Sequence, residues 1–406
     1  MTRPRSARLL AGMLALGLVA ASCGGDDDDD DADAPEATGT AAPAETDATE
    51  PADTTAADGT AGEGEGVDLS SVCPSPLVIQ TDWFAEAEHG ALYEMVGEGY
   101  SVDVDNKVVS GPLVAGGVET GIDIEVRSGG PAIGFAPPRA QIYTDDSIHI
   151  AYSNIDAQAL SWDDTPMVAI MAPLEINPQI VMWDPDTYPD IETIADLGDA
   201  GVTINIFPGF GFADVFVAQG IWSAGQVDPS YDGSSARFIA AGDIAQQGFA
   251  SAEPYNYEFV FEEYGKRPAF QLLHDAGYPV YSQTLSVLPE DVEGMAPCWE
   301  KFIPIVQQAA IDFVNAPDRA NAIIIDAVER FDTFWVYDQG LADFSVATQL
   351  ELGLVGNGPD DTLGNIEEDR VQEVLDLMRE ADAGIPADLE AADMFTNEFI
   401  DENIGL

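Results

Sequence analysis

Positive charge is scarce in this 406-residue chain, in which 14 Lys and Arg face 74 Asp and Glu and leave a formal net charge of −60 at pH 7. A protein that binds nucleic acid neutralises phosphates with Lys and Arg, so this composition excludes nucleic acid as a partner. An excess of acid on this scale is typical of a solvated surface adapted to salt. An acidic ligand site can account for only a small part of it.

Catalytic motifs are also missing. The three histidines are His89, His149 and His274, and the chain contains no G-x-S-x-G, no H-E-x-x-H and no Cys placed to work with a His. The usual arrangements of serine esterases and zinc peptidases are therefore excluded. A pair of carboxylates for glycoside hydrolysis stays open in so acidic a chain, although no spacing singles one out.

No apolar run after Cys23 is long enough to span a membrane. Before it, Arg3, Arg5 and Arg8 precede an uncharged run of 13 residues from Leu9 to Ala21, which is too short for a permanent span and suits a secretory signal. The following A-A-S-C resembles a bacterial lipobox. We therefore predict a signal peptide over residues 1–22 and lipidation at Cys23; a plain signal peptide cut nearby is the alternative.

The next segment is acidic and lacks core-forming residues. Residues 24–68 hold 16 Asp and Glu and no aromatic residue, Lys or Arg. Such a stretch cannot bury enough apolar surface to offset its ordering entropy, so we expect residues 23–70 to form a disordered tether. A lipid followed by this spacer would hold a domain beginning near Ser71 at the outer face of the cytoplasmic membrane, in the cell envelope or periplasm.

Cysteine is rare, with three in the chain. With Cys23 assigned to lipid, Cys73 and Cys298 remain as an even pair in an exported protein, which predicts a disulfide between the start of the domain and a late helix. Two free buried thiols are the alternative.

Short β-rich runs alternate with helical patterns, which is typical of α/β lobes built on mainly parallel sheets. The predicted strands cover 77–80, 122–126, 167–171, 202–207, 245–249 and 269–273. The predicted helices cover 87–96, 213–219, 298–315, 318–331 and 368–380. The pattern predicts one lobe from 71–167 and 282–406 and a second from 168–281, with hinges near Pro166–Met167 and Val280–Ser282. Because ligands of α/β sheets bind at the carboxyl ends of strands, a cleft is expected between the lobes.

Three stretches give the chain a resemblance to a known family. They are Q-T-D-W-F-A-E-A-E-H-G-A-L-Y, I-E-T-I-A-D-L-G-D-A-G-V-T-I and Q-Q-G-F-A-S-A-E-P-Y-N-Y-E. Together they resemble the solute-binding proteins of ABC importers, in particular the binders of thiamine-pyrimidine precursors and the related nitrate, taurine and alkanesulfonate binders. The resemblance implies a type II periplasmic-binding-protein fold with two α/β lobes of mixed, mainly parallel sheets, two hinge crossings, and delivery of a small ligand to a permease.

The stretch after the first predicted strand supplies candidate binding residues. The family pattern falls on Trp83, Glu86, Glu88 and His89; the pyrimidine binders commonly carry Pro-Asn where this chain has Ala85-Glu86, so the ligand stays open. Trp83 would stack on a flat or cationic ligand. The two acids could instead stabilise a helix start. His89 could be a helix residue satisfied by a neighbouring acid.

Tyr93 lies four residues beyond His89 on the same predicted helix face and is either a binding residue or part of the core. The acid-Pro motif of the family falls on Glu253-Pro254. Pro254 favours an extended Glu253 at the start of a loop, from which Tyr255 and Tyr257 would point to one side. A plain surface loop is the alternative.

Two glycine-rich stretches could offer backbone N–H groups to an anionic group. One contains Gly129 and Gly130, and the other runs from Gly209 to Phe212 and includes Phe210. Tight turns are the alternative for both. The aromatic and carboxylate content favours an amine-bearing, aminopyrimidine-type ligand, whereas a nitrate or sulfonate site would recruit Arg127 or Arg139.

The sequence therefore predicts a monomeric, exported solute-binding lipoprotein that is not an enzyme and needs no cofactor or metal. Its partners would be a small ligand and an ABC permease, with membrane contact only through the lipid. A taurine, alkanesulfonate or nitrate binder of the same fold is the first alternative. An extracellular enzyme and a surface adhesin are the others.

Overall fold

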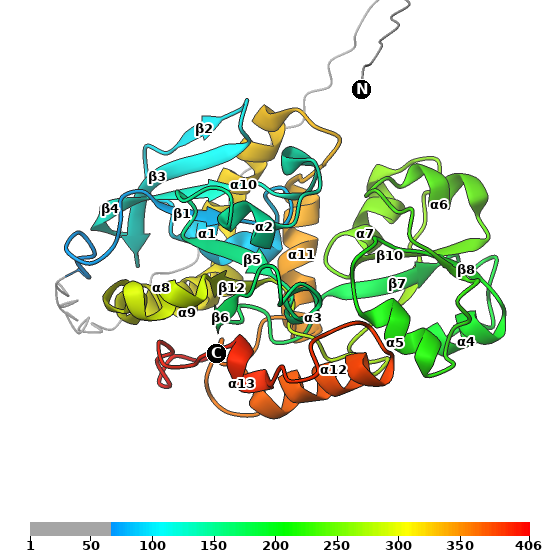
Figure 1. Ribbon diagram of the computed structural model, residues 1–406. Helices are drawn as coiled ribbons and strands as arrows, with labels where there is room; N and C mark the ends of the chain where they lie inside the picture. Colours follow the sequence, from blue (N-terminus) through cyan, green and yellow to red (C-terminus); the bar gives the residue numbers. More distant parts are fainter. Residues whose placement is uncertain (1–65) are drawn as a thin grey trace, which may run out of the picture. The chain divides into compact units, whose positions relative to one another are not determined.

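The computed structural model describes residues 66–406, which belong to one compact unit of mixed α/β structure (Figure 1). The predicted signal peptide, Cys23 and nearly all of the tether lie outside these residues. The folded part begins slightly before the predicted Ser71, because Leu69 is fully buried and its N–H donates to Thr120. No helix within residues 66–406 is both long and apolar enough to cross a bilayer.

The first sheet has seven strands in the order β2-β3-β4-β1-β5-β12-β6. Its strands are β1 (Leu77–Gln80), β2 (Ser101–Asp103), β3 (Val108–Ala115), β4 (Val118–Arg127), β5 (Ile150–Ser153), β6 (Val168–Met171) and β12 (Thr284–Val287). All four residues of β1 are buried because β1 is a central strand, with β4 and β5 parallel to it on either side. β4 instead alternates acidic and apolar residues, and its apolar side chains face the core.

The second sheet has five strands in the order β11-β7-β10-β8-β9. They are β7 (Gln179–Trp183), β8 (Thr203–Asn205), β9 (Val227–Asp228), β10 (Ile244–Phe249) and β11 (Ala269–Leu272). β10 is central, parallel to β8 and antiparallel to β7. The carboxyl ends of β8 and β10 therefore lie side by side, and the loops that follow them enter the site described below.

Both sheets are mixed, but the expectation that they would be mainly parallel is wrong, since antiparallel pairs outnumber parallel ones among the described strands. One reason is the β2-β3-β4 meander, in which Gly116 and Gly117 adopt φ values of 55° and 81° and close a two-residue hairpin. The other reason is that β12 returns antiparallel to both β5 and β6.

Helices flank both sheets. The longer ones are α9 (Ala296–Asn315), α10 (Asp318–Phe331), α11 (Gln339–Glu351) and α12 (Glu368–Glu380). The shorter ones are α1 (Gly90–Glu94), α2 (Pro138–Ile142), α3 (Ile155–Leu160), α4 (Ile194–Asp199), α5 (Phe212–Ala218), α6 (Ala236–Ala241), α7 (Glu253–Tyr255), α8 (Pro289–Gly294) and α13 (Ala391–Met394). Short turns η1 (Ala87–His89), η2 (Gly130–Ile133) and η3 (Asn256–Val260) complete the set.

The packing of these helices joins distant parts of the sequence. α1 packs against α9 and α10 over the first sheet, and a disulfide joins Cys73 to Cys298 of α9, the pair singled out above. α12 contacts α3 on the first-sheet side and α5 on the second-sheet side, as its position in Figure 1 shows. The C-terminal helices thus contribute to the hydrophobic core that lies against both sheets.

The predicted lobe boundary needs one adjustment. The range 168–281 contains all five strands of the second sheet, but β6 pairs with β12 in the first sheet. The first crossing between sheets therefore lies after β6, over residues 172–178, and later than Pro166–Met167. The second crossing, residues 273–283, contains the predicted position Val280–Ser282.

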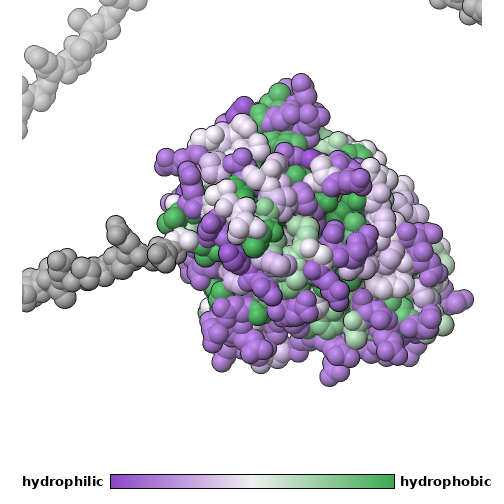
Figure 2. Space-filling model, turned by 60° about the vertical axis from the view of Figure 1, so that its left-hand side comes forward, coloured by the Kyte–Doolittle hydropathy of each residue, from purple (hydrophilic) through white to green (hydrophobic). Residues whose placement is uncertain are grey.

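The molecular surface agrees with the composition. Beyond Asp68 the chain carries 58 acidic and 11 basic residues, a net charge near −47. The face seen in Figure 2 is largely hydrophilic or intermediate, with apolar residues in small separate areas.

Candidate functional site

A cavity of about 430 Å³ is lined by residues from both sheets. On the first-sheet side, Asp82, Trp83 and Glu86 follow β1, Tyr152 and Ser153 end β5, and Gln283 precedes β12. On the second-sheet side much of the lining comes from the segments after β8, β9 and β10, and it contains Phe207, Phe210, Tyr231 and Glu253. Trp83 and Glu253, which are 170 positions apart in sequence, both line this cavity, one from each side.

Trp83 is the centre of an aromatic cluster. Its ring lies 6.0 Å from Phe207, 6.1 Å from Trp335 and 6.2 Å from Phe135, measured between ring centroids. Two glycines make room for the indole: a Cβ on Gly130 would lie 2.4 Å from Cε3, and one on Gly233 would lie 2.9 Å from Cη2. The sequence therefore keeps Gly at both positions so that Trp83 can lie between the two sides of the cavity.

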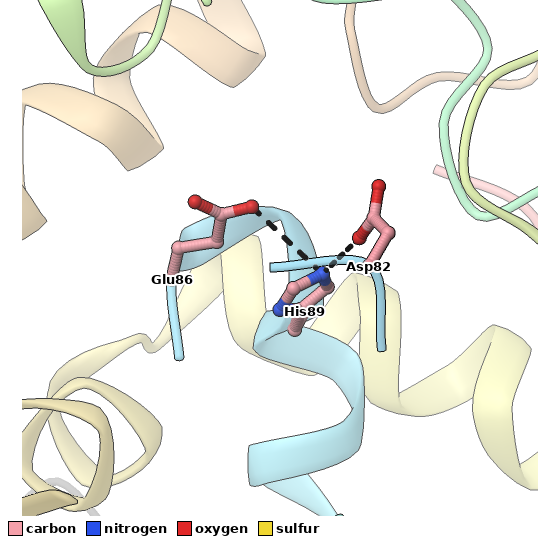
Figure 3. Close-up of side chains that lie close together, drawn as sticks. All are labelled: Asp82, Glu86 and His89. Carbon is pink, nitrogen blue, oxygen red and sulfur yellow. Dashed lines mark hydrogen bonds and ion pairs between the residues drawn. The ribbon is translucent and has the colours of Figure 1, made fainter. Parts of the chain in front are cut away.

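Asp82 is held by a frame of hydrogen bonds. His89 Nε2 lies 2.9 Å from Asp82 Oδ1 (Figure 3). The Gln283 amide donates to both carboxylate oxygens of Asp82 at 3.1 Å. Gln283 itself is fixed by Asn154 Oδ1, which accepts its backbone N–H at 2.9 Å. Gln283 and Phe135, which both line the cavity, have positive φ values of 53° and 60°. Backbone strain of this kind concentrates at functional sites.

Glu86 lies beside this frame, and its carboxylate is far less well satisfied. Its side chain is 8% exposed, and His89 Nε2 is 3.8 Å from Oε1 (Figure 3). It precedes η1 without a capping hydrogen bond, so the helix-start alternative is not what the side chain does. Burial raises the pKa of Glu86 well above its usual value, and the neighbouring Glu88, Asp82 and Glu253 raise it further.

Two further acids, Glu253 and Glu88, lie where the two sides of the cleft meet, and Glu88 links them. Glu253 Oε2 accepts the Phe249 N–H at 2.6 Å, while burial raises the pKa of Glu253 to about 7. Glu88 lies behind the lining and accepts a hydrogen bond from the Ser251 hydroxyl, across from the loop after β10. Burial raises the pKa of Glu88 as well.

Arg139 is the one basic side chain among the described residues that line the cavity. It forms no ion pair within 4.0 Å in the described part of the chain. Burial lowers its pKa, and the charge of Asp156 opposes that effect. Arg127 lies elsewhere and pairs with Glu125 and Asp145 at 2.6 and 2.9 Å.

Five of the ten predicted binding residues line the cavity. They are Trp83, Glu86, Gly130, Phe210 and Glu253. The others stand behind the lining or apart from it: His89, Tyr93, Gly129, Tyr255 and Tyr257. Both acids and both aromatic residues of the first group thus face the cavity, and their role in binding stays a prediction.

Each absent residue has a physical reason. His89 is fully buried against Asp82, and Tyr93 belongs to the core over the first sheet. The Gly129 N–H is taken by Trp83 O at 2.8 Å, and a Cβ there would lie 2.1 Å from Thr81 O. The glycine thus serves a tight backbone contact.

The prediction of an extended Glu253 is wrong. Residues 253–255 form the short helix α7, because Pro is tolerated in a first helical turn. The two tyrosines consequently do not point to one side. Tyr255 packs on Phe344, with ring centroids 5.6 Å apart, and Tyr257 is buried with its hydroxyl against Gln246.

The second glycine stretch also has an internal partner. Gly211 N donates to Asp156 Oδ2 at 3.0 Å, and Tyr278 donates to the same oxygen at 2.9 Å. An acid of the chain itself thus occupies the backbone donor that an anion would use.

Several lining residues were not predicted. Asp82 was within reach, since the rule that placed Trp83 after a parallel strand applies to it equally. Trp335 lies in F-W-V-Y, an aromatic-rich stretch that is itself a signal. Tyr152 and Gln283 carry no local signal, because β5 and β12 come together only through the sheet order.

Asp82, Glu86 and His89 could also hold a metal ion, since one ligand atom from each lies within 4.8 Å of the others. A metal on His89 Nε2 would move the proton to Nδ1, and a metal-bound His normally donates that proton to an acceptor. His89 Nδ1 is buried without a partner in residues 66–406. The hydrogen bonds that His89 and Gln283 make to Asp82 therefore explain the position of His89 better than a metal does.

No protein-family model and no curated protein matches the chain. Solved structures do. The ligand-binding component of an ABC-type import system from Staphylococcus aureus, with zinc bound, is 12% identical over 79% of this chain and 97% of that chain, with a TM-score of 0.52. A protein from Bordetella bronchiseptica RB50 is 14% identical over 80% of this chain and 96% of that chain, with a TM-score of 0.51. At such identities the likeness establishes the fold alone: the chain has the predicted periplasmic-binding-protein fold with two α/β lobes.

Proposed function

We propose that this protein is the extracytoplasmic solute-binding component of an ABC importer and that it binds rather than transforms its ligand. The observation that carries the proposal is the cavity to which both sheets contribute, with Trp83 and Glu86 on one side and Phe210 and Glu253 on the other. A ligand that touches both sides would stabilise a closed form. The description of the S. aureus neighbour as a ligand-binding component of an import system supports the same role.

The lining favours a small nitrogen-containing ligand of the aminopyrimidine type. Four acids, Asp82, Glu86, Asp232 and Glu253, face the cavity, against the single basic side chain of Arg139. Carboxylates accept hydrogen bonds from amino groups, and aromatic faces stack on flat or cationic rings. A bare anion would be repelled by most of these groups.

A sulfonate, taurine or nitrate ligand is the second candidate, and Arg139 is the observation that favours it. This guanidinium lines the cavity without an ion pair in the described residues, so it is available to an anionic group. A ligand with an anionic end would have to contact Arg139 and stay clear of Glu86 and Glu253.

The remaining parts of the proposal concern the cell. We infer an exported, monomeric lipoprotein, anchored through Cys23 and a tether over residues 23–70, that hands its ligand to a permease. The lobes would be residues 71–171 with 284–406, and 179–272, moved apart by hinges in the two crossings over 172–178 and 273–283. Metabolic labelling with a radioactive fatty acid, compared between the wild type and Cys23→Ala, tests the anchor.

The decisive experiment is to identify what the purified protein carries. Native mass spectrometry of the protein without denaturation, followed by release and identification of bound small molecules, tests the proposal directly. A thermal-shift screen should then show stabilisation by 4-amino-pyrimidines and none by taurine or nitrate, because a ligand raises stability by RT ln(1 + [L]/Kd). Turnover of a stabilising compound would contradict the binding role and favour an enzyme.

A further inference from the structure

The inference concerns which chemical group of the ligand meets the first-sheet side of the cavity, and it rests on the proposed function. The starting point is Glu86, which lines the cavity and whose side chain is only 8% exposed. Its nearest possible cation is His89 Nε2 at 3.8 Å, and that nitrogen is directed to Asp82 at 2.9 Å. The nearby Gln283 amide nitrogen already donates to both Asp82 oxygens.

Asp82 and Glu86 therefore differ in what they need. The carboxylate of Asp82 receives hydrogen bonds from His89 and Gln283 and is satisfied without a ligand. Glu86 is more enclosed, with a side chain 8% exposed against 27% for Asp82, and the one donor that acts on it is the Gln283 amide, which Asp82 already engages. Enclosing a carboxylate with so few donors costs free energy, which a ligand that brings donors would recover.

Two further oxygen atoms of the same wall lack partners. Gln283 and Tyr152 line the cavity, and Gln283 Oε1 and Tyr152 Oη are buried without a hydrogen-bond partner in residues 66–406. Their place next to Glu86 follows from the sheet. β1, β5 and β12 are neighbours, and Thr284, which follows Gln283, pairs with Ser153, which follows Tyr152.

Two of these three groups can only accept hydrogen bonds, and the Tyr152 hydroxyl can accept as well as donate. An amide oxygen is only an acceptor, and an ionised carboxylate is only an acceptor, so both require N–H or O–H donors. A tetraalkylated ammonium ion has a positive charge but no donor and would leave them unsatisfied. Trp83 and Trp335 line the same region, with centroids 6.1 Å apart, and offer apolar faces to a flat group.

We propose that this wall binds a flat cationic group with two or more N–H donors, of the amidinium, guanidinium or protonated aminopyrimidine class. Glu86 is its ionic anchor, Gln283 Oε1 and Tyr152 Oη accept its further N–H groups, and the Asp82–His89–Gln283 frame positions these acceptors. The site selects against quaternary ammonium ions of the same charge and size.

A matched pair of probes separates charge from hydrogen-bond donation. Benzamidinium and phenyltrimethylammonium both carry one positive charge next to a benzene ring, but only the first has N–H groups. Isothermal titration of the full-length protein should show benzamidinium binding at least tenfold more tightly, which corresponds to about 1.4 kcal/mol. Equal affinities would overturn the inference, as would failure of both probes to bind.

Variants locate the effect. Glu86→Gln should weaken benzamidinium binding at least tenfold, while Glu98→Gln, the same change at an exposed position, should leave it unchanged. Tyr152→Phe removes only the hydroxyl and should weaken benzamidinium binding without affecting phenyltrimethylammonium. Melting curves confirm that each variant is folded. An unchanged affinity in Glu86→Gln would overturn the assignment of the anchor.

Other outcomes distinguish this inference from the proposed function. Tight binding of taurine or nitrate, with neither cation bound, would overturn the inference and leave a solute-binding protein of the second type. Zn²⁺ binding that is lost in His89→Ala and competes with benzamidinium would overturn it in favour of a metal site. If mass spectrometry finds no carried ligand and no probe of any class binds, the proposed function fails as well.

Discussion

Glu253 offers a test of whether the cleft is closed in the absence of ligand. Its carboxyl lies in the cavity wall, where burial raises its pKa from 4.5 to about 7. The same group in the unfolded chain would ionise near its usual value. Glu253→Gln removes this ionisation and keeps the side-chain oxygen that accepts the Phe249 N–H.

The sign of the effect follows from the two pKa values. Below about pH 4.5 the carboxyl is protonated in both the folded and the unfolded state and does not lower the free energy of unfolding. Between pH 4.5 and 7 the unfolded chain ionises first, so the wild type loses stability as the pH rises, and the loss is complete above pH 7. At 1.36 kcal/mol per pH unit the loss is about 3 kcal/mol, an upper value because the group keeps some contact with the cavity.

Thermal unfolding at pH 4.5 and pH 8 measures this. For a folded part of this size the unfolding entropy is roughly 0.7 kcal/mol/K, so Glu253→Gln should raise the melting temperature by about 4 °C at pH 8 and by almost nothing at pH 4.5. Glu98→Gln, at an exposed site, should change the melting temperature relative to the wild type by the same small amount at both pH values. A gain in Glu253→Gln that does not depend on pH would refute the reasoning and mean that the carboxyl is solvated in the free protein.

Three further predictions address the fold and the motion. Gly130→Ala should cost about 1–3 kcal/mol of stability and reduce ligand affinity, seen in urea unfolding and titration, because its φ of 54° and the Trp83 ring 2.4 Å from the new Cβ both oppose a side chain. Cys298→Ala should lower the free energy of unfolding by about 2–5 kcal/mol, and the double variant Cys73→Ala/Cys298→Ala should be no less stable than the single one. Losses that add in the double variant would mean that the two thiols are not bonded. A verified ligand should lower the radius of gyration measured by X-ray scattering, and an unchanged radius would contradict closure.

The sequence predicted the helices best. The predicted ranges 318–331 and 368–380 coincide with α10 and α12, because a long apolar stripe determines a helix locally, even though neither helix has a side-chain N-cap. The β2-β3-β4 meander was missed although Gly116-Gly117 marks its hairpin. The strand directions were misjudged for a different reason: β12 joins the first sheet only after the chain returns from the second, and no local pattern records that path.

In the candidate site, too, residues marked by a local sequence pattern could be predicted, and residues placed by tertiary packing could not. Trp83 and Glu253 could be predicted because each follows a strand whose carboxyl end faces the cavity. Gln283 could not, since it enters the site by packing against Asn154 and Asp82, which are 129 and 201 positions away. A sequence read without alignment shows which residue types a strand end carries, but not which strand ends meet.

The distribution of acids also explains how a cation would couple binding to closure. Glu86 comes from the first-sheet side and Glu253 from the second, and the charge of Glu253 is one of the causes that raise the pKa of Glu86. Bringing the two sides together while the cleft is empty therefore places two carboxyls in a poorly solvated space, where they must take up protons or repel each other. Opening returns both to water. A positively charged ligand that touches both sides would remove this penalty, so in the proposed mechanism the free energy of closure would come from the same contacts that select the ligand.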